Sequence, residues 1–141
     1  MGLNFRSNCA ISSALDLIGD KWSLLILRDM MFFGKKTFSE FAASEEKIAT
    51  NILSDRLSNL EEAGIIKKGK LPDNKKTNIY SLTPKGITFL PSLIEVILWS
   101  DRNLAEHITP ENKLLADIIK KDKHSFTEMM YAKLEKEIII K

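Results

Sequence analysis

The residues best suited to do chemistry in this sequence are lysines, which gather in two short stretches. Lys35 and Lys36 form the first, and the second, between residues 67 and 76, holds five lysines against one acid, Asp73. Clustered lysines neutralise nucleic-acid phosphates and release counterions, which gives affinity without sequence information. A lysine-rich strand edge also resists aggregation, so the sequence leaves both interpretations open at this point.

Short polar side chains form a second group, on a helix expected at about residues 49–63. Such side chains can contact base edges or phosphates, and Asn51 suits adenine while Arg56 suits guanine. An ordinary solvated helix surface would have the same composition. The candidates for DNA binding are Lys35, Lys36, Thr37, Ala49, Thr50, Asn51, Ser54, Asp55, Arg56, Lys68, Lys70, Asn74, Lys75 and Lys76.

Catalytic and metal sites are not expected. One cysteine, Cys9, and two histidines, His107 and His124, are too few for a structural zinc site, and no local signature makes them a nucleophile and base. Residues 34–37 (GKKT) would fit the end of a phosphate-binding loop, but Asp29 stands where that loop needs a glycine. We therefore expect no enzyme, no cofactor and no metal.

Length and composition indicate one globular domain. The 141 residues are 44% hydrophobic and 28% charged, with a formal net charge of +2. No apolar run is long enough for a membrane helix, since the best candidate, residues 22–33, contains Arg28 and Asp29. The N-terminus lacks the apolar stretch of a signal peptide, and a single cysteine fits a reducing compartment. We expect a cytoplasmic protein without a membrane partner.

Two helices are expected ahead of the polar residues. Apolar side chains at helical spacing predict one over residues 9–18, which Gly19 would end. Asp20 is a good N-cap for the next, which would run from Lys21 to about Phe32. Because this stretch is apolar almost all round, we expect it to form the buried centre of the domain.

A short helix, a turn and the longer polar helix follow. Thr37 and Glu40 have capping-box spacing, which predicts a helix over 38–43, and residues 44–47 then make a turn. The periodicity changes after the helix at 49–63. Strands are predicted over 65–70 and 77–82, joined by a turn at 72–74, and a further helix over 84–106 would be kinked by Pro91.

This order of elements predicts an α+β, mostly α, winged helix-turn-helix, in which the second helix of the motif enters the major groove. We assign residues 1–106 to this domain with its dimerisation helices, and residues 107–141 to a C-terminal helical extension. Within the extension, Leu114, Ile118 and Ile119 predict one amphipathic helix, and residues 138–140 predict an apolar end that packs on a partner subunit.

Several motifs resemble those of one family. They are the stretch CAISSALDLIGDKWSLLILRDMMFFGKKTFSEF from Cys9, then LSNLEEAGII, then YSLTPKG, and together they span about residues 8–100. The sequence resembles the HxlR family of bacterial winged-helix transcriptional regulators, close relatives of the MarR group. The resemblance implies a homodimer that binds a palindromic operator, with dimerisation through the N-terminal segment and the helix at 84–106.

Three departures from the family pattern stand out. Ala10 follows Cys9 where the family usually has proline, and Ala49 precedes the polar helix where serine is common. The tip of the hairpin is LPDNKKTN in place of a proline-rich sequence. We therefore expect the operator contacted by the wing to differ from that of better-known members.

Cys9 has two interpretations. The resemblance implies redox or electrophile sensing, since some members react with quinones or form an intersubunit disulfide at this position. A thiol near a helix N-terminus also has its thiolate favoured by the helix dipole. Alternatively, Cys9 is a small apolar side chain beneath a dimer interface. The sequence does not identify an inducer.

The helix at 84–106 supplies more apolar positions than one small domain can cover. Some of these side chains would pack in the chain's own core. Those near the middle of the helix would remain exposed, and exposed apolar patches of this kind mark interfaces. The expected dimer interface comprises Leu93, Ile97, Leu98 and Trp99. The competing hypothesis is a winged helix that contacts another protein and binds no operator.

Overall fold

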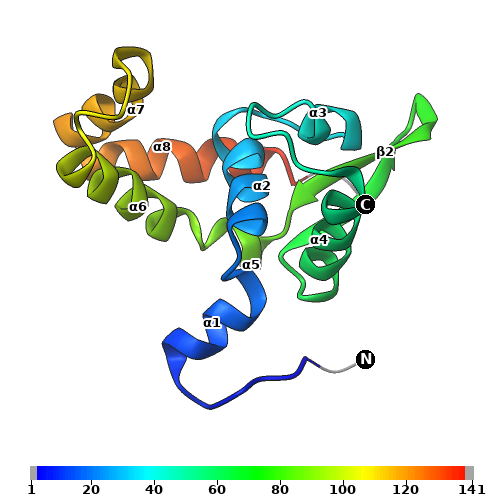
Figure 1. The fold of residues 1–141 in the computed structure, drawn as a ribbon. Coiled ribbons are helices and arrows are strands. Elements are labelled where there is room, and N and C mark those ends of the chain that lie inside the picture. Colours follow the sequence, from blue (N-terminus) through cyan, green and yellow to red (C-terminus); the bar gives the residue numbers. More distant parts are fainter. Residues whose placement is uncertain (1–2, 139–141) are drawn as a thin grey trace.

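The structure is a computed structural model that describes residues 3–138. Eight helices and two strands follow one another in this part of the chain (Figure 1). Their bounds are α1 Ala10–Ile18, α2 Lys21–Phe32, α3 Phe38–Ala42, α4 Thr50–Glu62, β1 Ile66–Leu71, β2 Asn74–Leu82, α5 Pro84–Ile87, α6 Leu90–Asn103, α7 Pro110–Lys121 and α8 Lys123–Lys136. The predicted class, mostly helical with one small antiparallel sheet, is confirmed.

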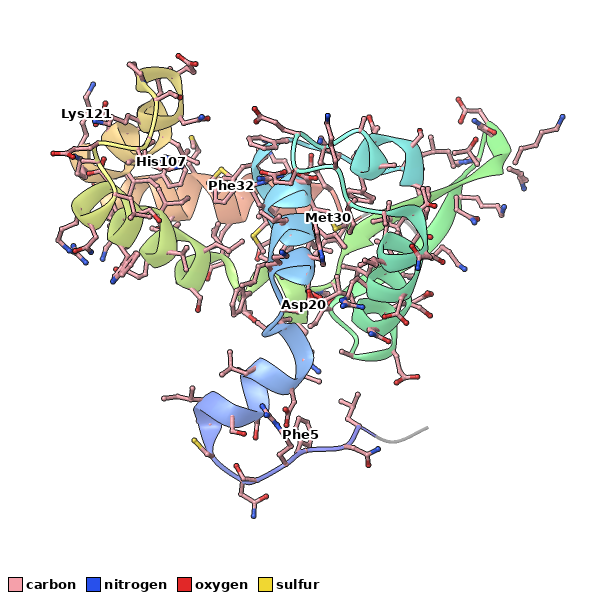
Figure 2. The ribbon with its side chains drawn as sticks, in the orientation of Figure 1. Phe5, Asp20, Met30, Phe32, His107 and Lys121 are labelled. Carbon is pink, nitrogen blue, oxygen red and sulfur yellow. The ribbon has the colours of Figure 1, made fainter. Side chains whose placement is uncertain are left out.

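Helix α2 lies at the centre of the molecule, as predicted. In Figure 1, α3, α4 and the β-hairpin lie on one side of it and α6 and α7 on the other, while α8 passes behind it. Its side chains Leu27 and Met31 are fully buried. Asp20 caps its N-terminus by accepting a hydrogen bond of 2.8 Å from the backbone N–H of Ser23. Figure 2 shows Asp20 and Phe32 at opposite ends of this helix.

Helices α3 and α4 form the expected helix-turn-helix. The capping box of Thr37 and Glu40 is present and starts α3. The turn into α4 passes through Lys47, whose φ of +59° is the only positive value at a non-glycine residue between residues 3 and 138. Ala49 then occupies the N-cap of α4 without a side-chain hydrogen bond, so the departure from serine leaves this helix start without a side-chain cap.

Strands β1 and β2 form the expected hairpin. They pair in antiparallel register from Ile66 opposite Leu82 to Lys70 opposite Asn78, and the register shifts at the tip. The base of the hairpin is buried and its outer half is exposed. The backbone N–H of Tyr80 also donates to the carbonyl of Lys36 over 2.8 Å, which attaches the hairpin to the segment before α3.

The helix predicted over 84–106 is two helices, α5 and α6. Thr83 caps α5 as expected, but the chain turns at residues 88–89 and α6 starts anew. Pro91 therefore lies in the first turn of α6, where no hydrogen bond is lost, and it causes no kink. Close packing makes Gly86 necessary, because a Cβ there would lie 2.1 Å from the carbonyl oxygen of Ile65.

Helices α7 and α8 pack against the rest of the chain. Phe126, Met130 and Leu134 of α8 belong to the same buried cluster as α2 and α4. The amphipathic face of α7 differs from the prediction, since Ile119 is buried while Leu114 and Ile118 are 61% and 51% exposed. Of the predicted apolar end, Ile138 packs against the core, whereas residues 139–140 lie outside the described part of the chain.

Candidate nucleic-acid interface

The exposed face of α4 presents short polar side chains. Three buried leucines, Leu53, Leu57 and Leu60, fix the opposite face against the core. The predicted residues Ala49, Thr50, Asn51, Ser54 and Asp55 are all exposed at or after the start of this helix. The structure therefore brings most of the predicted contacts of α4 together on one surface.

The hairpin extends this surface with positive charge. All five lysines, Lys67, Lys68, Lys70, Lys75 and Lys76, are exposed. None of them forms an ion pair with another residue in the range 3–138. Figure 1 shows that the hairpin projects beside α4. Asn74 shapes the tip, because its side chain accepts from the backbone N–H of Lys76 over 3.2 Å. These lysines are available to phosphates.

Lys35 and Lys36, expected together at the start of the motif, differ in the structure. The side chain of Lys36 is exposed. The ammonium of Lys35 instead donates to the Ser44 hydroxyl over 3.0 Å and lies 3.5 Å from the buried Asp29 carboxylate. The expectation that Lys35 contacts phosphate is revised, because its charge is paired inside the protein.

Arg56 is also engaged within the protein. Its Nε donates to Asp20 over 2.7 Å, and another guanidinium nitrogen donates to Asp55 over 2.5 Å. A guanine edge needs two parallel donors from the same group. In this structure Arg56 is therefore not free to contact a base, and its hydrogen bond to Asp20 joins α4 to the start of α2.

The Asp20 carboxylate is held in its charged form. Burial acts to raise its pKa, but hydrogen bonds from Ser23 and the charge and hydrogen bond of Arg56 together outweigh burial, so the pKa lies below the ordinary 3.8. A charged Asp20 is thus the stable partner of Arg56 at neutral pH. One carboxylate both caps α2 and orients α4.

A buried polar network behind the motif was not predicted from the sequence. Asp29, 2% exposed, accepts hydrogen bonds from Ser44 over 2.5 Å and from the neighbouring Arg28. Arg28 also donates two hydrogen bonds, of 2.6 and 2.9 Å, to the Glu46 carboxylate. These hydrogen bonds hold the pKa of Glu46 below 4.5. The charged Arg28–Asp29 pair inside an apolar run was the sequence signal for this network.

The network has a structural consequence for the motif. Ser44 and Glu46 belong to the turn between α3 and α4, whereas Arg28 and Asp29 belong to α2. Because four hydrogen-bonded side chains join the turn to the central helix, the position of α4 depends on α2.

The predicted dimer residues divide into two groups. Leu93 is only 6% exposed and lies in the chain's own core, so its expected place in an interface is wrong for this chain. Leu93 belongs to the core cluster that also contains side chains of α2 and α8, and α7 and α8 both pack against α6. Ile97 and Leu98 are half-buried, while Trp99 is 54% exposed.

Cys9 lies at the N-cap of α1 and is exposed. Its side chain makes no capping hydrogen bond, and its backbone N–H donates to the Ser7 hydroxyl over 3.2 Å. Within this chain the thiol is therefore accessible to solvent and not packed in the core. The structure does not bring Cys9 near the lysines of the hairpin, since α1 extends away from the body (Figure 1).

Comparison with known proteins places these features in a family. A family model described as HxlR-like helix-turn-helix matches residues 17–108, from the end of α1 to the segment after α6. The chain belongs to the HxlR-like helix-turn-helix family. It is a transcriptional regulator of the HxlR/MarR type, and the predicted winged helix-turn-helix is confirmed.

Relatives of known sequence agree with this assignment to the HxlR-like family. The uncharacterized HTH-type transcriptional regulator YvaP of Bacillus subtilis (strain 168) is 33% identical over 87 residues, which cover 62% of this chain and 80% of YvaP. The HTH-type transcriptional regulator YodB of the same organism is 33% identical over 92 residues, covering 65% of this chain and 81% of YodB.

Solved structures of similar proteins share the fold. The redox regulator HypR in its oxidized form is 32% identical with a TM-score of 0.60, covering 67% of this chain and 97% of HypR. The reduced form of YodB is 31% identical with a TM-score of 0.57, covering 69% of this chain and 95% of YodB. The family model and these relatives describe helix-turn-helix transcriptional regulators.

The described part of the chain contains neither a metal-binding cluster nor a membrane-spanning helix. Within residues 3–138, no group of three or more histidine, cysteine, aspartate or glutamate side chains could hold a metal ion. No helix in that range is long and apolar enough to cross a membrane.

Proposed function

We propose that this HxlR-like protein acts as a homodimer on a palindromic DNA operator, to which α4 supplies base contacts and the β-hairpin supplies phosphate contacts. The observation that supports this most is the group of five exposed hairpin lysines beside the polar face of α4, which form no ion pair within residues 3–138. Phosphate contacts give affinity and position, whereas base-edge contacts give specificity. The protein has both kinds of side chain on one surface.

Asn51 provides the sharpest test of this proposal. Asparagine pairs with adenine through two hydrogen bonds, and Asn51 is exposed in the first turn of α4. Asn51→Ala should weaken binding to DNA from upstream of the protein's own gene by about 1–3 kcal/mol, with little effect on random duplexes. Gel-shift titrations at fixed salt measure both.

The matched control is Asn59→Ala. Asn59 is exposed on the same helix two turns later, and its amide contacts Asp55 over 3.4 Å. We expect this variant to bind DNA as the parent does. Absence of any specific binding by the parent protein would instead favour the competing role, a winged helix that contacts another protein.

We also propose a thiol-dependent control of DNA binding through Cys9. The thiol is exposed at the start of α1, and the similar structures include HypR in an oxidized form and YodB after diamide treatment. Two Cys9 thiols from two subunits would form one disulfide, losing two protons and passing two electrons to diamide. Diamide should then produce a dimer that persists on a non-reducing gel and disappears with Cys9→Ser.

A further inference from the structure

A pocket lies on the side of α2 that faces away from the proposed DNA surface. Its volume is about 480 Å³, and its walls come from α2, α6, α7 and the turn after α3. In Figure 1, α6 and α7 lie on the same side of α2, and Figure 2 labels Phe32 at the end of α2 that forms part of the wall. Pockets for small molecules span about 300–1,000 Å³ and are lined mainly by apolar side chains.

The apolar lining comes from three helices. Leu25 and Phe32 of α2, Val96 and Ile97 of α6, and Leu115 of α7 face the same space, and Phe33 stands at the end of α2 beside it. Phe33 is 58% exposed, and the Arg28 guanidinium lies 5.2 Å from the centre of its ring. The walls therefore combine branched aliphatic side chains with aromatic rings.

The charges at the pocket balance one another. Arg28 and Lys35 contribute two positive charges, and Glu45 and Glu46 contribute two negative charges. Arg28 is already bound to Asp29 and Glu46, and Lys35 is bound to Ser44. An anionic ligand would have to displace one of these partners. A cationic ligand that paired with Glu45, which is exposed and makes no ion pair within residues 3–138, would lie beside the positive charges of Arg28 and Lys35 in the same wall, whereas a neutral ligand would leave each pair intact.

We propose that this pocket binds a neutral, ring-containing apolar molecule. Burial of such a ligand removes apolar surface from water on both sides, and the ligand brings no charge of its own that would have to lose its water. The wall supplied by α7, including Asn112 and Leu115, lies beyond residue 108, where the match to the family ends. The pocket thus depends on a part of this chain that the family match does not include.

The position of the pocket links it to the DNA-binding motif. Arg28 and Lys35 line the pocket and also bind the turn between α3 and α4, through Glu46 and Ser44 respectively. A ligand that shifts Arg28 or Lys35 would move this turn and with it the start of α4. This regulatory consequence rests on the proposed function, whereas ligand binding itself does not.

The experiment uses the neutral dye N-phenyl-1-naphthylamine, whose fluorescence rises in apolar surroundings. The full-length protein should bind the dye saturably. Val96→Asp places a charge in the wall and Asn112→Trp fills the pocket from α7, and each should weaken binding about tenfold or more. Both positions are exposed, at 53% for Val96, so the fold should tolerate the changes.

The matched control is Ile118→Asp. Ile118 is 51% exposed on α7 but is not part of the pocket, so this variant should change dye binding less than about twofold. No saturable binding to the parent protein, or equal weakening by all three variants, overturns the proposal. Dye affinity that falls as the chain self-associates, followed by sedimentation, would assign the pocket to a second copy and also overturn it.

Gel shifts on the same samples separate the two proposals. Dye binding without operator binding supports the pocket and refutes the proposed DNA function. Operator binding without dye binding overturns the pocket alone.

Discussion

At the residue scale, Asp20 has two structural roles, which are usually filled by separate side chains. Its carboxylate caps α2 through Ser23 and pairs with Arg56 of α4 at 2.7 Å. Asp122 caps α8 through Ser125 with the same pair of hydrogen bonds, at 3.0 and 2.8 Å, and its hydrogen bonds are to residues of its own helix. The two aspartates therefore separate the effect of capping from the effect of positioning.

Replacing each aspartate tests this difference. Asp20→Ala and Asp122→Ala should both lower the free energy of unfolding by about 0.5–2 kcal/mol, the usual value of an N-cap. Only Asp20→Ala should also weaken operator binding, because it frees Arg56 and loosens α4. Urea unfolding and gel shifts measure the two effects, and equal DNA affinity in both variants would remove the positioning role.

Glu46 predicts a pH dependence of stability. Its hydrogen bonds from Arg28 hold the folded pKa below 4.5, so the folded protein binds fewer protons than the unfolded chain just below that pH. The stabilisation is therefore complete above 4.5 and is lost as the pH falls through the folded pKa. Glu46→Gln should lower the unfolding free energy at pH 7 by about 0.5–1 kcal/mol, as expected of a partly exposed pair.

The control for this prediction is Glu45→Gln. Glu45 is the adjacent carboxylate of the same turn and makes no ion pair within residues 3–138. Chemical unfolding between pH 7 and 3 should show the difference between parent and Glu46→Gln shrinking toward acid, and no such trend for Glu45→Gln. A difference that grows toward acid would mean that the Glu46 pKa is raised on folding, and it would contradict the prediction.

The sequence could not predict which ion pairs and hydrogen bonds individual side chains form. Residue type and spacing placed Lys35 and Arg56 at the DNA surface, and in the chain both lie next to it. Their charges are nevertheless paired with Asp29, in the preceding helix, and with Asp20, which lies 36 residues before Arg56. The partners of long, flexible side chains are set by the residues that surround them in the folded chain, and the periodicity of the sequence contains no information about these surroundings.

At the scale of elements, the hairpin has one dominant property, its charge. Its outer half offers no apolar contact to the core, and its lysines are exposed. We expect Lys75→Ala with Lys76→Ala to weaken binding to all duplexes alike and to flatten the salt dependence by about one to two units of slope. The measurement is a series of gel shifts or anisotropy titrations across salt concentrations.

The control removes the same charge elsewhere. Lys133 and Lys136 are exposed on α8, and replacing both by alanine changes net charge equally. If this pair alters DNA affinity as much as the hairpin pair, overall charge and not hairpin contact would account for the effect.

Local signals explain which elements the sequence predicted well. The N-caps at Asp20, Thr37 and Thr83 act within one turn of the chain, so their helices began where expected. The break between α5 and α6 and the burial of Leu93 have no such local signal, and α8, which is distant in sequence, packs against both helices. Contacts between segments far apart in the chain are set by tertiary packing and leave no local pattern.

At the scale of the whole molecule, apolar surface remains after the chain has folded. Helix α1 extends from the body, with Ile11 72% and Leu15 52% exposed (Figure 1). On α6, Trp99 remains exposed although Leu93 does not. An isolated helix with one apolar face gains little stability alone and needs a partner surface. These residues, and not Leu93, now define the expected dimer interface.

The last prediction concerns this interface. Ile11→Glu and Trp99→Glu should each give monomers with an intact fold, because the changed side chains are exposed in the single chain and would be buried only between two. Met129→Glu, at 55% exposure on α8, is the control and should remain dimeric. Sedimentation at micromolar concentration distinguishes these states.

Loss of the dimer should also weaken operator binding far more than loss of one phosphate contact. A two-fold symmetric pair of α4 helices can contact two major grooves one turn of DNA apart, about 34–36 Å, whereas one chain contacts a single half-site. The Trp99→Glu monomer should therefore bind a half-site as well as it binds the full operator, while the parent should prefer the full site. A parent protein that sediments as a monomer, or that shows no such preference, would contradict both the interface and the palindromic operator.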